Sequence, residues 1–204
     1  MILRLGKDVK FLLRWTEECI RSHDPGPFHQ WVIWNHPIDD SVMNQIWYDE
    51  QPIYKVNLNI IKKDTFDVKA SAGFDEEGFV TINVNIFANS MNHVPSGLRS
   101  DLINVYAHEL QHLTQYNMPF QRVGAIKYDS KDVESNSDYY EYFTDENESE
   151  AFAAGCLYES RSTGMDFATV SDSFLSLYVF EKAITKKQKQ IIKEKWKNSI
   201  NKVF

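Results

Sequence analysis

Apolar residues recur along the N-terminal part of the chain first at helical and then at alternating spacing. Between residues 8 and 22 they follow one face of a helix. Residues 28–34 and 53–61 are typical of strands, and in the second of these apolar and polar side chains alternate. This part of the chain is therefore expected to combine a helix with a sheet.

The next apolar stretches predict a hairpin followed by a helix. Residues 71–87 form two strand-like runs separated by a turn at residues 75–78. After a loop, a helix is expected from about Asp101 to Asn117, with Ser100 as its N-cap and Pro119 closing it. The strand before this helix should have one polar side.

The C-terminal half is expected to begin with an irregular segment and to continue as helices. Residues 119–145 lack periodicity and are rich in acidic and aromatic side chains, so they are expected to be irregular and are a candidate lid. Helices are expected from residue 146 onward. The expected organisation is one α+β domain over residues 1–204. Its parts are a helix and sheet (1–99), a central helix (100–118), the irregular segment (119–145) and a helical part (146–204).

Composition and charge narrow the function classes. The 204 residues are 43% hydrophobic, which suffices for one core, and no window approaches the ~20 apolar residues of a membrane span. The two cysteines make no CxxC pair, so a cytoplasmic protein with free thiols is expected. The net charge of -7 argues against general nucleic-acid binding. Residues 182–204 nevertheless carry eight lysines and one acid, which we interpret as a solvated helix face.

Two histidines stand four residues apart in YAHELQHLTQYN, residues 106–117. On a helix His108 and His112 lie on one face about a turn apart, so both imidazoles can reach one metal ion. Glu109 lies about 100° around the helix from His108. There it can act as a base on water at the metal without having to bind the metal. The spacing gives all three residues a chemical role.

The same spacing also fits an ordinary polar helix face. The context favours a metal site, because the segment is a predicted helix, follows a predicted strand and offers apolar side chains on its other face. These side chains are Val105, Ala107, Leu110 and Leu113. A catalytic zinc site would also need a third protein ligand and an open position for water.

Two motifs together resemble a known family. His-Glu-Leu-Gln-His at residues 108–112, followed by Asn-Glu-Ser-Glu-Ala at residues 147–151, is similar to the gluzincin branch of the zincin metallopeptidases. Small members of this branch occur in bacteria and their phages. The resemblance covers roughly residues 54–160 and implies a zincin-like α+β fold with Zn²⁺ as cofactor. It implies His108, His112 and Glu148 as the ligands.

Several glutamates compete for the position of the third ligand. Glu148 matches the family pattern, since Asn147 precedes it and the small Ala151 follows where two helices must pack closely. Glu150 remains the alternative. The chain departs from the family at Phe152, where several members have an aspartate that supports the first histidine. The full set of competing residues is Glu141, Glu146, Glu148 and Glu150.

The resemblance implies a zinc-dependent metallopeptidase that hydrolyses peptide bonds of a peptide or protein substrate. Glu109 would be the general base, and Tyr142 would donate to the developing oxyanion, although its aromatic run also fits plain packing. Extended substrate would pair with an edge strand just before the active-site helix. The residues implied there are Asn85, Ile86, Phe87 and Ala88.

Other functions are compatible with the same motifs. One is a non-catalytic binding or assembly protein on a zincin scaffold, which the intact Glu109 argues against. Another is a zinc hydrolase of a non-peptide amide, which a deep closed pocket would favour over an open groove. A third is nucleic-acid association through the lysines of residues 182–204. If the protein is phage-encoded, the virion or the host cytoplasm is the expected location.

Overall fold

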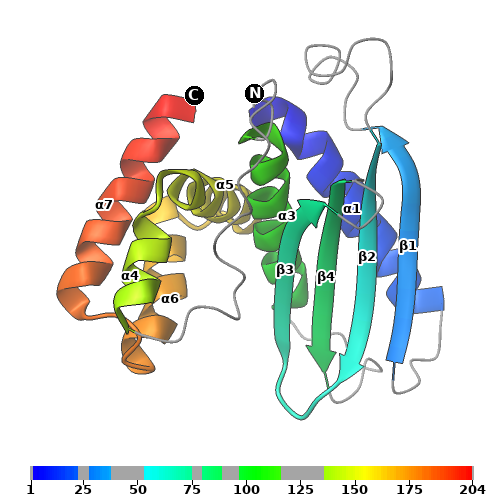
Figure 1. The fold of residues 1–204 in the computed structure, drawn as a ribbon, viewed down its shortest axis with the longest axis horizontal. Coiled ribbons are helices and arrows are strands. Elements are labelled where there is room, and N and C mark those ends of the chain that lie inside the picture. The colour runs from blue at the N-terminus through cyan, green and yellow to red at the C-terminus, as the bar shows by residue number, and fades with distance from the viewer. Residues whose placement is uncertain are drawn as a thin grey trace.

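The computed structural model describes residues 2–22, 28–37, 53–74, 80–88, 97–115 and 136–203. Helices and one four-stranded mixed sheet make up these ranges, which confirms the expected combination of helix and sheet. The elements are α1 (Ile2–Ser22), β1 (Phe28–Pro37), β2 (Ile53–Lys62), β3 (Asp67–Phe74), β4 (Val80–Ala88), α3 (Leu98–Gln115), α4 (Asn136–Thr144), α5 (Glu146–Thr163), α6 (Phe167–Phe180) and α7 (Lys186–Val203). Figure 1 shows α4, α6 and α7 grouped beside the sheet part, with α5 between the two groups.

The sheet has the strand order β1-β2-β4-β3, with β2 and β4 parallel and the two outer pairs antiparallel. Apolar side chains of β2 and β4 point to one face, where Leu58 and Val84 are a fully buried pair. The opposite face carries hydrogen-bonded asparagines, with Asn57 donating to Asn83 and Asn59 to Asn85. The alternation in the sequence thus becomes one core face and one polar face.

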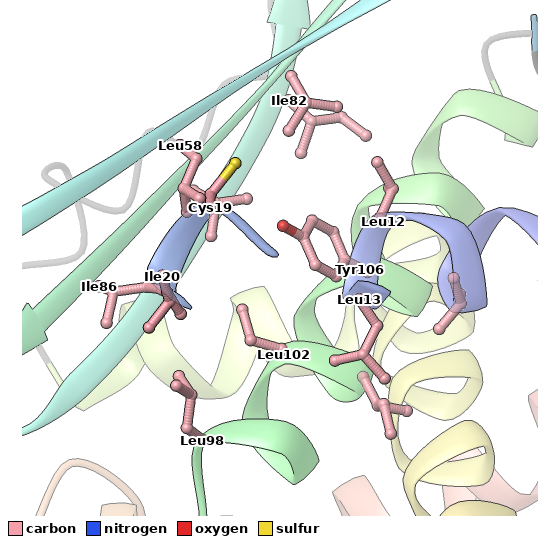
Figure 2. Close-up of a cluster of buried hydrophobic side chains, with 14 of the residues drawn as sticks. Leu12, Leu13, Cys19, Ile20, Leu58, Ile82, Ile86, Leu98, Leu102 and Tyr106 are labelled. Atoms are coloured by element: carbon pink, nitrogen blue, oxygen red, sulfur yellow. The ribbon is translucent and has the colours of Figure 1, made fainter. Parts of the chain in front are cut away.

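Helices α1 and α3 cover the apolar face and complete the first core (Figure 2). Leu12 of α1 and Leu102 of α3 are fully buried in it. The phenol of Tyr106 is buried at the same place and lies 2.5 Å from the hydroxyl of Thr16, so its polar end is satisfied inside the core. This packing fixes the apolar back of α3 and leaves its histidine side facing α5.

A second core lies among α4, α5, α6 and α7. Its centre is aromatic, with Phe152 stacked on Trp196 at 4.9 Å between ring centroids and Phe143 edge-on to both. The indole of Trp196 donates to the carbonyl of Phe143. Two lysines of the basic segment 182–204 form ion pairs beside this core, since Lys189 and Lys193 of α7 pair with Asp172 of α6.

Several expectations from the sequence need correction. Ser100 is not an N-cap, because α3 begins at Leu98 and the Ser100 hydroxyl donates instead to Glu159. Residues 136–144 are not irregular but form α4, whose aromatic side chains are drawn into the second core. The expected turn at 75–78, Pro119 and the candidate lid before residue 136 lie outside the described residues. Within the described ranges, none of the helices combines the length and apolarity that a membrane span requires.

Candidate metal centre

The two histidines of α3 converge on one point. The Nε2 atoms of His108 and His112 lie 3.0 Å apart, and each residue is 7% exposed. Residues on the opposite side of α3, such as Ala107 and Leu110, are fully buried in the sheet core. The helix is therefore fixed by its apolar back and turns both imidazoles towards α5.

Helix α5 brings the third side chain. Asp145 is its N-cap and accepts hydrogen bonds from the backbone N–H groups of Asn147 and Glu148, which fixes where the helix begins. Oε2 of Glu148 then lies 3.4 Å from Nε2 of His108 and 3.5 Å from Nε2 of His112. The structure brings these three residues together, and their nearest possible ligand atoms all lie within 4.8 Å of one another.

Close packing of α3 on α5 makes this convergence possible. Gly155 faces Asn104, and a Cβ on Gly155 would lie only 2.5 Å from the Asn104 side-chain oxygen and 2.9 Å from its backbone oxygen. The Asn104 amide donates to Glu159 at 2.6 Å, which ties the two helices one turn further along. Ala151, the small residue that follows Glu148 in the motif, is fully buried.

The arrangement fits a tetrahedral zinc ion. Zn–N distances of about 2.0–2.1 Å imply ligand atoms about 3.3 Å apart, close to the three separations given above. Oε2 of Glu148 is buried and, among the described residues, has no well-formed hydrogen bond. Two imidazoles and one carboxylate are the ligand set of many catalytic zinc sites. The residues present therefore fit zinc in number, chemistry and spacing.

The Glu148 carboxylate and the facing imidazoles shift one another's pKa values. Burial alone would raise the pKa of Glu148, but the facing imidazoles of His108 and His112 lower it to about 2. Burial would lower the pKa of His112, but Glu148 and Glu109 together raise it to about 9. The carboxylate is thus held ionised, the form that a metal needs, whereas His112 has to release a proton when a metal binds.

Glu109 lies beside this cluster and is 4% exposed. Burial raises its pKa, and the neighbouring imidazoles of His108 and His112 oppose that rise. Its carboxylate also accepts a hydrogen bond from the backbone N–H of Ala72 in β3. Glu109 is therefore held between the metal cluster and the outer edge of β3.

Tyr142 reaches the cluster from α4. Its hydroxyl is hydrogen-bonded to Glu148, and burial together with the charges of Glu148 and Glu109 holds its pKa far above the ordinary value. The phenol is therefore a permanent O–H donor. Phe152, named from the sequence as a departure from the gluzincin pattern, packs its ring edge-on against His108 at 4.4 Å. The first histidine thus has an aromatic neighbour at this position.

The strand named from the sequence as the substrate-binding edge is an interior strand. β4 is paired with β2 on one side and with β3 on the other. Both rows of backbone groups are therefore used, and a peptide cannot be added to it. The residues concerned are Asn85, Ile86, Phe87 and Ala88. Among the described strands the outer strand next to α3 is β3.

The remaining glutamates are placed elsewhere. Glu150, the alternative ligand, accepts a hydrogen bond from the Gln115 amide at 3.2 Å, and Glu141 and Glu146 are exposed. The sequence reasoning missed Gln115, whose side-chain oxygen lies 2.9 Å from Nδ1 of His112. The signal available was its position three residues after His112, on the same helix face.

Comparison with known proteins found no similar protein. The chain matches no model of a protein family, no curated protein and no solved structure.

Proposed function

We propose that this protein is a zinc-dependent metallopeptidase of gluzincin type, with His108, His112 and Glu148 as the metal ligands. The observation that carries the proposal is the convergence of three buried ligand atoms, two from α3 and one from α5. Buried Glu109 beside them supports a catalytic rather than a purely structural site. A structural metal would need no such carboxylate.

Each side chain has a distinct task in this proposal. When bound, zinc supplies a Lewis acid and lowers the pKa of a coordinated water to about 7. Glu109 would accept the proton of the attacking water, and burial raises its pKa above the ordinary value, which makes it a stronger base. Tyr142 offers an O–H donor for the oxyanion that develops on the scissile carbonyl.

An extended peptide would pair with the outer edge of β3. The N–H of Ala72 points away from β4, because it donates to Glu109. In an antiparallel strand the N–H and C=O of one residue point to the same side, and every second residue repeats the direction. Ala70 should therefore also present its backbone groups to that edge. Pairing there would bring a scissile carbonyl beside Glu109, which supports a peptide substrate.

Metal analysis tests the ligand set. Wild-type protein equilibrated with zinc and desalted should retain about one ion per chain. Glu148→Gln should lose it, because an amide is a much poorer zinc ligand than a carboxylate. Glu150→Gln tests the alternative ligand and should retain zinc, because a glutamine oxygen there can still accept the hydrogen bond from Gln115. Zinc lost only in Glu150→Gln would assign the third ligand to Glu150, and no zinc in the wild type would refute the proposal.

The catalytic part needs a separate variant. Glu109→Gln preserves shape and should keep zinc, but it should lower the hydrolysis of a synthetic peptide mixture by about 10²–10⁴-fold, since it removes the general base. Cleavage products are read by mass spectrometry, with Glu141→Gln as the active control, because Glu141 is exposed on α4. Zinc binding with no cleavage by the wild type would favour a binding protein or a hydrolase of another amide.

A further inference from the structure

Gln115 links the second histidine to the helix that carries the third ligand. Its side-chain oxygen lies 2.9 Å from Nδ1 of His112. Its amide nitrogen donates to the backbone carbonyl of Asn147 at 2.8 Å and to the carboxylate of Glu150 at 3.2 Å. One amide side chain therefore contacts α3 and α5 on either side of the proposed metal.

The hydrogen-bond partners of Gln115 determine the orientation of its side-chain amide. A backbone carbonyl and a carboxylate can only accept hydrogen bonds, so the –NH₂ group of Gln115 must face Asn147 and Glu150. The amide oxygen must then face His112. Because that oxygen is also an acceptor only, Nδ1 of His112 has to carry a proton. When metal binding displaces the second ring proton, the lone pair is left on Nε2, the atom that faces His108 and Glu148.

We propose that Gln115 is a positioning residue that holds His112 in its Nδ1–H form, aims Nε2 at the metal, and ties this histidine to the first turn of α5. The inference rests on the proposed metal centre and adds a residue to it. It also gives Glu150 a role other than that of a ligand, as an anchor for the Gln115 amide. Glu148 lies between the two α5 anchor points, Asn147 and Glu150, so the same side chain aligns a histidine ligand with the carboxylate ligand.

Two variants separate the functions of this side chain. Gln115→Met keeps its length but removes every hydrogen bond, and it should weaken zinc binding about 10–100-fold, as loss of a partner of a metal-bound histidine does. Gln115→Glu, combined with Glu150→Gln so that two carboxylates do not face each other, keeps an acceptor for Nδ1 and loses the donation to the Asn147 carbonyl, so its affinity should lie between wild type and Gln115→Met. Affinities are measured by competition with a chromophoric chelator, with far-UV circular dichroism as the folding control.

A spectroscopic readout distinguishes positioning from general stability. In the zinc-loaded wild type, the Nδ1 proton of His112 should give a protected imidazole signal in ¹⁵N-edited NMR. This signal should be lost to solvent exchange in Gln115→Met and restored in Gln115→Glu combined with Glu150→Gln. Wild-type affinity with an intact signal in Gln115→Met would overturn the inference while leaving the metal centre standing. Failure of the wild type to bind zinc would overturn both.

Discussion

At the scale of single residues, the helix start decides between the two candidate glutamates of α5. Residues two apart on a helix point about 200° apart, so Glu148 and Glu150 cannot both face the histidines. Capping by Asp145 sets the helix phase and turns Glu148 inward. A carboxylate in the first turn is also favoured by the helix dipole. The sequence pattern pointed to Glu148, and the cap is the physical reason for its orientation.

Tyr142 has two roles that a substitution can separate. If it stabilises the oxyanion, Tyr142→Phe should keep zinc and lower turnover about 100-fold, the typical loss for one such donor. If it only holds Glu148, the variant should bind zinc more weakly and turn over normally at saturating zinc. We expect the first result, measured as kcat and zinc affinity on the same preparations. Tyr139→Phe is the control, because Tyr139 packs on Tyr178 in the aromatic core.

The sequence allowed part of this centre to be predicted residue by residue. The i, i+4 spacing places His108 and His112 on one helix face whatever surrounds them, so their convergence could be predicted from the sequence. The contacts of Gln115 with α5 could not be predicted, because Asn147 and Glu150 lie on another helix more than thirty residues away. Such cross-element hydrogen bonds depend on how α3 and α5 cross, and no local pattern encodes that crossing.

At the scale of elements, the crossing of α3 and α5 depends on one residue without a side chain. Asn104 of α3 occupies the space that a side chain at Gly155 would fill, and its amide binds Glu159 of the same helix α5. The helices can approach closely only because position 155 is glycine. Their separation in turn sets the distance from the histidines to Glu148.

Gly155→Ala tests this dependence. Alanine normally stabilises a helix by about 0.5–1 kcal/mol relative to glycine. Here the added Cβ would clash with Asn104, so we expect a net loss of about 1–3 kcal/mol in the free energy of unfolding, and weaker zinc binding. Gly73→Ala is the matched control, because nothing lies within 4 Å of its added Cβ. Urea unfolding measures both, and equal stability of the two variants would contradict the account.

Elements with a strong local pattern were predicted well, and those that depend on distant contacts were not. The β3–β4 pairing follows from adjacent strands, whereas the parallel pairing of β4 with β2 is non-local. The expected edge strand is wrong for that reason. Helix α4 was missed because its aromatic and acidic run has no clean period, and it gains its stability from packing on α6 and α7.

At the scale of the whole molecule, the centre lies where two cores meet. The first core joins the sheet to α1 and α3, and the second is formed by α4, α5, α6 and α7. The histidines belong to a helix of the first core and Glu148 to a helix of the second. The basic helix α7 takes part in the second core, since Lys195 donates to the backbone carbonyl of Thr144 at the end of α4. A metal ion at the centre would therefore bridge both halves.

Zinc should consequently stabilise the whole fold. At a free concentration 100 times its Kd, a ligand that binds only the native state contributes about 2.7 kcal/mol. For a chain of this size each kcal/mol raises Tm by about 2–4 °C, so the expected rise is about 5–11 °C. Differential scanning calorimetry of the wild type should show this rise, and excess chelator should reverse it. Glu148→Gln should show none, because the carboxylate that joins α5 to the metal is gone, whereas Glu141→Gln, at an exposed position of α4, should respond like the wild type. An equal rise in Glu148→Gln would mean that zinc binds elsewhere and that the bridge between the two cores does not form.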